Sequence, residues 1–174
     1  MKKVLMVVIA FALVAVPLTG CLGDDSTASL QEIAITESDL PEGWEFLVDF
    51  YYNQTEVGPE FVMEDGVDAY IKYFKYGNST RIVIQLLRFE TPDAASSHFN
   101  KYHDELANST YQQIISDDVN IGDECFLLDD GGSVGYILRV GNILAGVGFE
   151  EPPIGALDEA TLENLAEIQA SRMA

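Results

Sequence analysis

The segment Gly131–Gly135 matches the G-x-S-x-G pattern of hydrolases that use a nucleophilic serine. That chemistry needs a sharp strand-to-helix turn, which exposes the serine, and a histidine later in the chain. Here a stretch typical of a strand follows Ser133, and both histidines, His98 and His103, precede it. We therefore predict a glycine-rich turn at this position, no catalytic residue, and a protein that is not an enzyme.

The histidines and the acidic residues do not form a metal-binding pattern. His98 and His103 are five residues apart, so they do not share one face of a helix. Acidic pairs at 117–118, 123–124 and 129–130 lack the spacing of a calcium-binding loop, and a zinc site needs three or four converging ligands. We expect surface histidines and solvated turn carboxylates, with weak cation binding as the alternative. We predict no metal and no cofactor.

Cys21 stands at the end of a segment whose residue order is typical of an export signal. Lys2 and Lys3 form a basic start, an apolar run extends from Val4 to Val16, and Leu-Thr-Gly directly precedes the cysteine. This order is typical of a secretory signal peptide, and its ending looks like a lipobox, where the cysteine is lipidated and the chain is cut before it. The run is shorter than the roughly 20 residues of a membrane-spanning helix. We predict a lipoprotein signal peptide at 1–20 and a lipid anchor on Cys21.

The charge of the chain restricts its partners. It holds 29 acidic and 9 basic residues, for a formal net charge of −20. Such a surface repels nucleic acid and anionic lipid headgroups, so we predict no nucleic-acid partner and membrane contact only through the lipid. An apolar content of 48% is too high for disorder, so the charge must lie on a folded body. We expect a flexible tether at 21–29 and a single extracytoplasmic domain at 30–174.

Two further residue types bear on an exported chain. Once Cys21 is lipidated, Cys125 has no disulfide partner, and its apolar surroundings predict a small buried hydrophobe rather than a reactive thiol. Asn53, Asn78 and Asn108 each begin a complete N-glycosylation sequon, at predicted loops or helix ends. They are candidate glycosylation sites if the host modifies its surface proteins, as many archaea do.

Alternation of apolar and polar residues predicts that strands dominate the domain. Every second residue from Trp44 to Tyr52 is apolar, which predicts a strand with one strongly apolar face. Residues 82–89 are apolar on both faces and therefore need cover on both sides of a sheet. The predicted strands are 44–52, 67–76, 81–89, 112–116, 124–128, 134–140 and 143–149.

Helices and a hairpin complete the predicted fold. Thr91 can cap a helix that starts with Pro92, and a second helix begins near Asp158. Gly141-Asn142 joins the last two strands as a two-residue loop, which needs positive φ values. We predict an α+β fold, with a mainly antiparallel sheet and helices packed on its faces.

Aromatic residues gather on one face of the second predicted strand. Tyr70, Phe74 and Tyr76 share that face, close to Tyr51 and Tyr52 of the neighbouring strand. If exposed, they would form a sugar-binding or protein-binding patch. If a helix covers them, they are core. We favour core, since buried aromatic residues are more common.

Three short motifs carry a resemblance to known proteins: Leu40–Trp44, Ile121–Glu124 and Arg139–Asn142. With the lipobox, they resemble uncharacterised archaeal envelope lipoproteins and some actinobacterial ones. The order of elements is similar to the PsbP-like α/β/α sandwich and to the extracellular sensor domains of mycobacterial receptor kinases. The resemblance implies a binding or accessory protein without catalytic residues. No functional residue is transferred, because the motifs look structural.

The sequence thus favours a lipid-anchored, non-enzymatic protein on the extracytoplasmic face of the cell membrane. Its partner would be an envelope protein or a small ligand that the sequence does not identify. The alternative is a lipid or small-molecule carrier or sensor with an apolar pocket between sheet and helix. A hydrolase is the third interpretation, and it would need an acid–base pair that the sequence does not reveal.

Overall fold

A single seven-stranded antiparallel sheet, in the order β1-β2-β3-β7-β6-β5-β4, forms the centre of the protein. The structure is a computed structural model that describes residues 28–53, 66–77, 80–110, 112–129, 133–150 and 159–174. The strands are β1 (Trp44–Asn53), β2 (Gly66–Tyr76), β3 (Thr80–Phe89), β4 (Gln113–Ser116), β5 (Glu124–Asp129), β6 (Ser133–Val140) and β7 (Ile143–Glu150).

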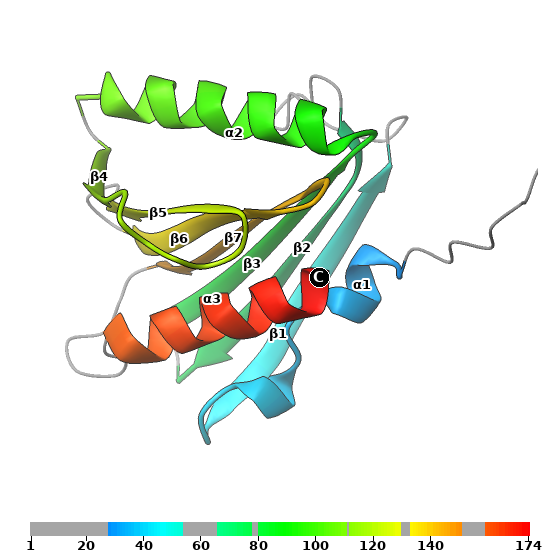
Figure 1. The fold of residues 1–174 in the computed structure, drawn as a ribbon. Helices are drawn as coiled ribbons and strands as arrows, with labels where there is room; N and C mark the ends of the chain where they lie inside the picture. The colour runs from blue at the N-terminus through cyan, green and yellow to red at the C-terminus, as the bar shows by residue number, and fades with distance from the viewer. Residues whose placement is uncertain (1–27, 54–65, 78–79, 111, 130–132, 151–158) are drawn as a thin grey trace, which may run out of the picture.

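Helices cover both faces of this sheet. α2 (Pro92–Ala107) crosses one face and α3 (Glu159–Met173) crosses the other, with the short α1 (Leu30–Ile33) beside α3 (Figure 1). A 3-10 turn, η1 (Glu37–Asp39), leads into β1. No helix in the described ranges has the length and apolarity that a membrane span requires. The predicted α+β fold with a mainly antiparallel sheet is confirmed.

Two apolar layers stabilise the fold, one on each face of the inner strand β3. Ile82, Ile84 and Leu86 pack toward the side that holds Leu162 and Leu165 of α3. The other layer contains the following buried residues of β3, β5 and α2: Phe89, Phe126, Phe99 and Leu106. A fully buried side chain of this size contributes about 1.5–3 kcal/mol to stability. The prediction that this strand needs cover on both sides is confirmed.

β1 departs from the predicted alternation because a β-bulge interrupts its pairing with β2. Phe46 lies opposite Phe74, whereas Val48 lies opposite Tyr73, so the register shifts by one residue between them. Neighbouring residues of a strand point to opposite faces of the sheet, so Phe46 and Val48 also do. The prediction of one strongly apolar face was therefore wrong. β1 carries apolar side chains on both faces, and except for Trp44 they are not buried.

The β6–β7 hairpin confirms the predicted Gly141-Asn142 loop. Gly141 has a φ of 57°, and a Cβ built there would meet nothing within 4 Å. Its requirement for glycine is therefore purely conformational.

We expect Gly141→Val to lower the free energy of unfolding by about 1–3 kcal/mol, because a β-branched residue resists positive φ. Urea denaturation measures this loss. Gly141→Asn is the control, and it should cost much less because asparagine tolerates this conformation.

Candidate interaction surface

Five large apolar side chains of β1 are exposed along one edge of the sheet. Their exposed fractions are 45% for Phe46, 41% for Leu47, 36% for Val48, 44% for Phe50 and 45% for Tyr51. We call these five residues the β1 surface. β1 is the end strand of the sheet, and no described strand pairs with its outer side. Several exposed apolar side chains gathered on one element are typical of an interaction site, whereas single exposed apolar residues are ordinary.

The placement of the helices explains why β1 is uncovered. α2 packs on β3, β4, β6 and β7, while α3 packs on β6 and β7. The smaller α1 contacts β2 and β3. β1 forms the opposite edge of the sheet from β4 (Figure 1), and the three helices make their main packing contacts with the other strands. The sequence nevertheless gives β1 the apolar residues of a buried strand.

Polar contacts with β2 hold the side of the β1 surface that contains Phe46. The Tyr70 hydroxyl donates a 2.6 Å hydrogen bond to Asp49. Lys72 places its Nζ 5.9 Å from the ring centroid of Phe46 and 5.3 Å from that of Phe74, so it forms a cation–π contact with both. Burial lowers the pKa of Lys72, while the negative charge of Asp49 opposes that shift. Burial and the bond to Asp49 raise the pKa of Tyr70, which keeps its hydroxyl a donor.

Other contacts order the far end of the β1 surface. The Tyr51 hydroxyl donates a hydrogen bond of 3.1 Å to Asp68, whose side chain is almost fully buried. The rings of Phe50 and Tyr52 stack with their centroids 6.4 Å apart. Exposed side chains that are already held in place lose less entropy when a partner binds. The β1 surface is thus pre-organised as well as exposed.

The predicted aromatic face divides into core and surface. Tyr70 and Phe74 are buried, as the favoured interpretation requires. Tyr76 and Tyr51 are exposed, so for them the core interpretation was wrong, and Tyr52 is half-buried. The division follows from the sheet order, because cover by helices and neighbouring strands ends at β2.

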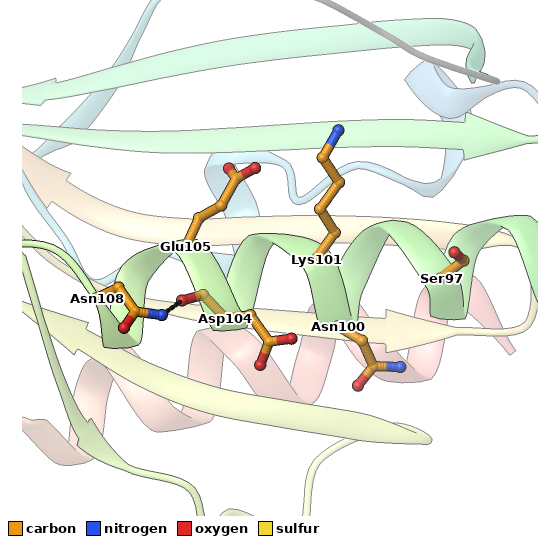
Figure 2. Close-up of a pocket in the computed structure, with 6 residues that line it drawn as sticks. All are labelled: Ser97, Asn100, Lys101, Asp104, Glu105 and Asn108. Atoms are coloured by element: carbon orange, nitrogen blue, oxygen red, sulfur yellow. Dashed lines mark hydrogen bonds between the residues drawn. The ribbon is translucent and has the colours of Figure 1, made fainter.

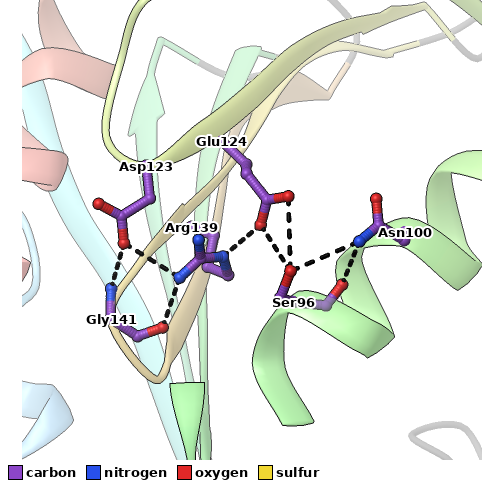
Figure 3. A network of polar contacts seen from close by, with 6 residues as sticks. All are labelled: Ser96, Asn100, Asp123, Glu124, Arg139 and Gly141. Atoms are coloured by element: carbon purple, nitrogen blue, oxygen red, sulfur yellow. Dashed lines mark hydrogen bonds and ion pairs between the residues drawn. The ribbon is translucent and has the colours of Figure 1, made fainter. Parts of the chain in front are cut away.

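A network of ion pairs and hydrogen bonds joins two of the motifs seen in the sequence (Figure 3). Its contacts stabilise the fold. Arg139 of β6 forms an ion pair with Glu124 and, at 3.0 Å, another with Asp123. Asp123 also accepts a 2.8 Å hydrogen bond from the Gly141 amide. Ser96 of α2 donates to Glu124 at 3.1 Å. Asp123 keeps 49% of its side chain exposed, as the predicted solvated pair requires, whereas Glu124 is 29% exposed, and both carboxylates hold the β6–β7 hairpin to β5.

The described part of the segment that matches the hydrolase pattern is a strand, and the predicted glycine-rich turn falls largely outside the described residues. Ser133 is the first residue of β6, so a strand follows it where a serine nucleophile would need a helix. Residues 130–132 lie outside the described ranges. His103 Nε2 is 2.9 Å from an Asp117 oxygen, and His98 packs against the Phe89 ring at 5.0 Å. Within the part of the chain that the structure describes, no three potential metal ligands converge.

Cys125 is buried in β5, which confirms its predicted role as a small core residue. Burial raises the pKa of its thiol to about 12. The thiol therefore stays protonated at neutral pH and is a poor nucleophile.

The other predicted modification sites are only partly described. Asn108 ends α2 and is exposed, with its side-chain amide donating to the Asp104 carbonyl at 2.7 Å. Asn53 is the last residue of β1 and is half-buried. Asn78, Cys21 and the predicted signal peptide at 1–20 lie outside the described residues.

The surface hollow on α2 differs from the pocket that a carrier needs. Six polar or charged side chains, five of α2 and that of Asn108 directly after it, line this hollow, which opens to solvent (Figure 2): Ser97, Asn100, Lys101, Asp104, Glu105 and Asn108. A second hollow, between the segment around Pro41 and the start of α3, is also open. Neither is the enclosed apolar cavity in which a lipid would be buried.

No family model matches the chain, and no curated protein sequence is detectably similar to it. Its fold is similar to the extracellular domain of PknH from Mycobacterium tuberculosis. The TM-score is 0.61 at 8% sequence identity, over 83% of this chain and 94% of that domain. The likeness confirms the resemblance of the fold to the extracellular domain of a mycobacterial kinase. At so low an identity, the fold is what the two proteins share.

Proposed function

We propose that the protein is a lipid-anchored interaction module on the extracytoplasmic face of the cell membrane, with no catalytic activity. The β1 surface would bind another envelope protein. One observation supports this most directly: an end strand of 10 residues exposes five ordered apolar side chains. An exposed apolar edge is a liability for aggregation unless something covers it. A lipid on Cys21 would keep such an edge beside other membrane-bound proteins.

The extracytoplasmic location rests on the sequence and agrees with the fold. The basic start, the apolar run and Cys21 have the order of a lipoprotein signal. The domain of PknH that has a similar fold is extracellular. This is compatible with the proposal that the present domain also works outside the cell. The high acidic charge of the chain and its three N-glycosylation sequons are compatible with a protein on the surface of an archaeal-type cell envelope. A carrier with an apolar pocket remains the second candidate on sequence grounds.

The anchor has an all-or-none test. Cys21→Ser should abolish lipidation and the coupled cleavage, because no thiol remains to take the lipid. The wild type should fractionate with membranes, begin at Cys21, and show the added lipid mass. The variant should keep residues 1–20 and lack that mass. Ser26→Ala, in the predicted tether, is the control and should behave as wild type. An unmodified Cys21 in the mature wild type would refute the anchor.

Photo-crosslinking on intact membranes tests the interaction. A photoreactive phenylalanine analogue replaces Phe50 in one variant and Ile115 in another. Ile115 is a matched control, because it is 54% exposed and lies in β4 at the opposite edge of the sheet. We expect a discrete crosslinked product from position 50 and none from position 115. Equal products from both positions, or none from either, would contradict the proposal.

A further inference from the structure

We infer that the β1 surface binds an extended, basic segment of its partner as an eighth strand of the sheet. This inference rests on the proposed function and specifies the partner. It concerns how the partner is recognised: through a backbone ladder along β1, apolar contacts on both faces of the sheet, and Lys or Arg side chains that meet carboxylates beside the strand.

The position of β1 favours strand addition over binding to a flat patch. β1 pairs on one side with β2 along almost its whole length, and no strand among the described residues pairs with its other side. An end strand presents backbone donors and acceptors to an added chain. The Phe46 amide already donates to the Glu37 carboxylate at 3.1 Å. The added strand would therefore be centred beyond that contact, near Val48 and Phe50.

The bulge in β1 determines which side chains the added segment needs. It places Phe46 on one face of the sheet and Val48 with Phe50 on the other. A segment added along β1 would extend both apolar faces, so it needs apolar side chains in both of its alternating positions. A segment with a single apolar face would cover only half of the exposed surface.

Charge selects a basic partner. Glu45 and Asp49 lie on opposite faces of β1, and both are exposed. Carboxylates near the start of β1 outnumber the lysines beside it. The carboxylates are Glu37, Glu42, Glu45 and Asp49, and the lysines are Lys72 and Lys75. Glu45 is already paired with Lys75 at 3.2 Å, which leaves three carboxylates against Lys72. The whole chain carries a formal charge of −20, so a second copy would be repelled where a basic segment would be attracted.

A synthetic peptide of the same length as β1 tests this recognition. Pairs of valines alternate with pairs of lysines, so that each face of the extended peptide presents both types. We expect saturable binding to the full-length, membrane-extracted protein by fluorescence anisotropy, and weaker binding as salt is added. Replacing the lysines with glutamates should weaken binding at least about tenfold. N-methylation of the amides along one edge, which removes ladder donors, should abolish it.

Variants of the protein locate the binding site. The double variant Val48→Lys with Phe50→Lys removes apolar contacts and adds like charge, so it should lose peptide binding. Ile115→Lys, on the opposite edge, should bind as wild type. Both variants should keep the wild-type circular dichroism spectrum and melting temperature. In wild type, the peptide should slow hydrogen exchange of β1 amides more than that of β4 amides.

Each contrary result has a distinct meaning. Equal binding of the lysine and glutamate peptides would overturn the inference. So would binding of the N-methylated peptide as tight as that of the unmethylated lysine peptide. Dimers of the wild type that the Val48→Lys, Phe50→Lys double variant abolishes would make a second copy the occupant, which also overturns it. Absent peptide binding together with a crosslinked product from position 50 would overturn the inference but leave the proposed function. Absence of both would refute the inference and the proposed function together.

Discussion

Gly122→Ala should destabilise the domain by about 2–4 kcal/mol, a large loss for a single added methyl group. Gly122 has a φ of 68°, which disfavours every residue with a Cβ. A Cβ built there would also lie 2.6 Å from the Arg139 carbonyl oxygen. That carbonyl is backbone and accepts a 2.8 Å hydrogen bond from the Asp123 amide, so it cannot move without loss.

Comparison with a second glycine separates the stability loss caused by the clash at position 122 from the loss caused by the left-handed backbone conformation. Gly77 has a nearly equal φ of 62°, but a Cβ there would meet nothing within 4 Å. Gly77→Ala should therefore cost only about 1 kcal/mol, which reflects the left-handed conformation alone. Urea denaturation of both variants gives the comparison. Equal losses would show that the chain relaxes around the new methyl group at position 122, and that the contact with Arg139 is not rigid.

The sequence predicted most of the sheet because its strands follow simple local rules. All seven strand segments and both long helices were located, and the Gly141-Asn142 loop was identified from its length and residue types. The capping box of α1, in which Ser29 and Glu32 bond reciprocally, is a local signal that was present but not used. Such features depend on residues a few positions apart, so sequence alone can reveal them.

The candidate site was harder to predict because it depends on whether other strands pair with β1 and whether helices cover it. The residues of β1 alternate as a buried strand would, and the bulge between Phe46 and Val48 has no clear signature in the sequence. Whether a strand lies at the edge is decided by the order of all the strands, which is a long-range property. The partners of Arg139 were likewise missed, because Glu124 begins a neighbouring strand and Asp123 directly precedes it.

Gln169→Leu should be strongly destabilising, although leucine looks like the better core residue. Gln169 is fully buried in α3. Its side-chain oxygen accepts a 3.1 Å hydrogen bond from the Ile35 amide, and its amide donates to the Ile33 carbonyl at 3.0 Å. Leucine would leave both backbone groups buried without these partners. Each such group costs about 1–3 kcal/mol, so the free energy of unfolding should fall by about 2–5 kcal/mol.

The control for this prediction lies on the same helix. Glu163 is exposed, so Glu163→Leu should change stability by no more than about 0.5 kcal/mol. Hydrogen exchange gives a second readout, because the Ile35 amide should exchange faster in Gln169→Leu even under conditions where the whole domain stays folded. Wild-type stability with unchanged exchange at Ile35 would mean that the segment after α1 is held by apolar packing. A loss of protection from exchange that is confined to the Ile35 amide and its neighbours would show that Gln169 holds the N-terminal segment against α3, more than 130 residues away in the sequence.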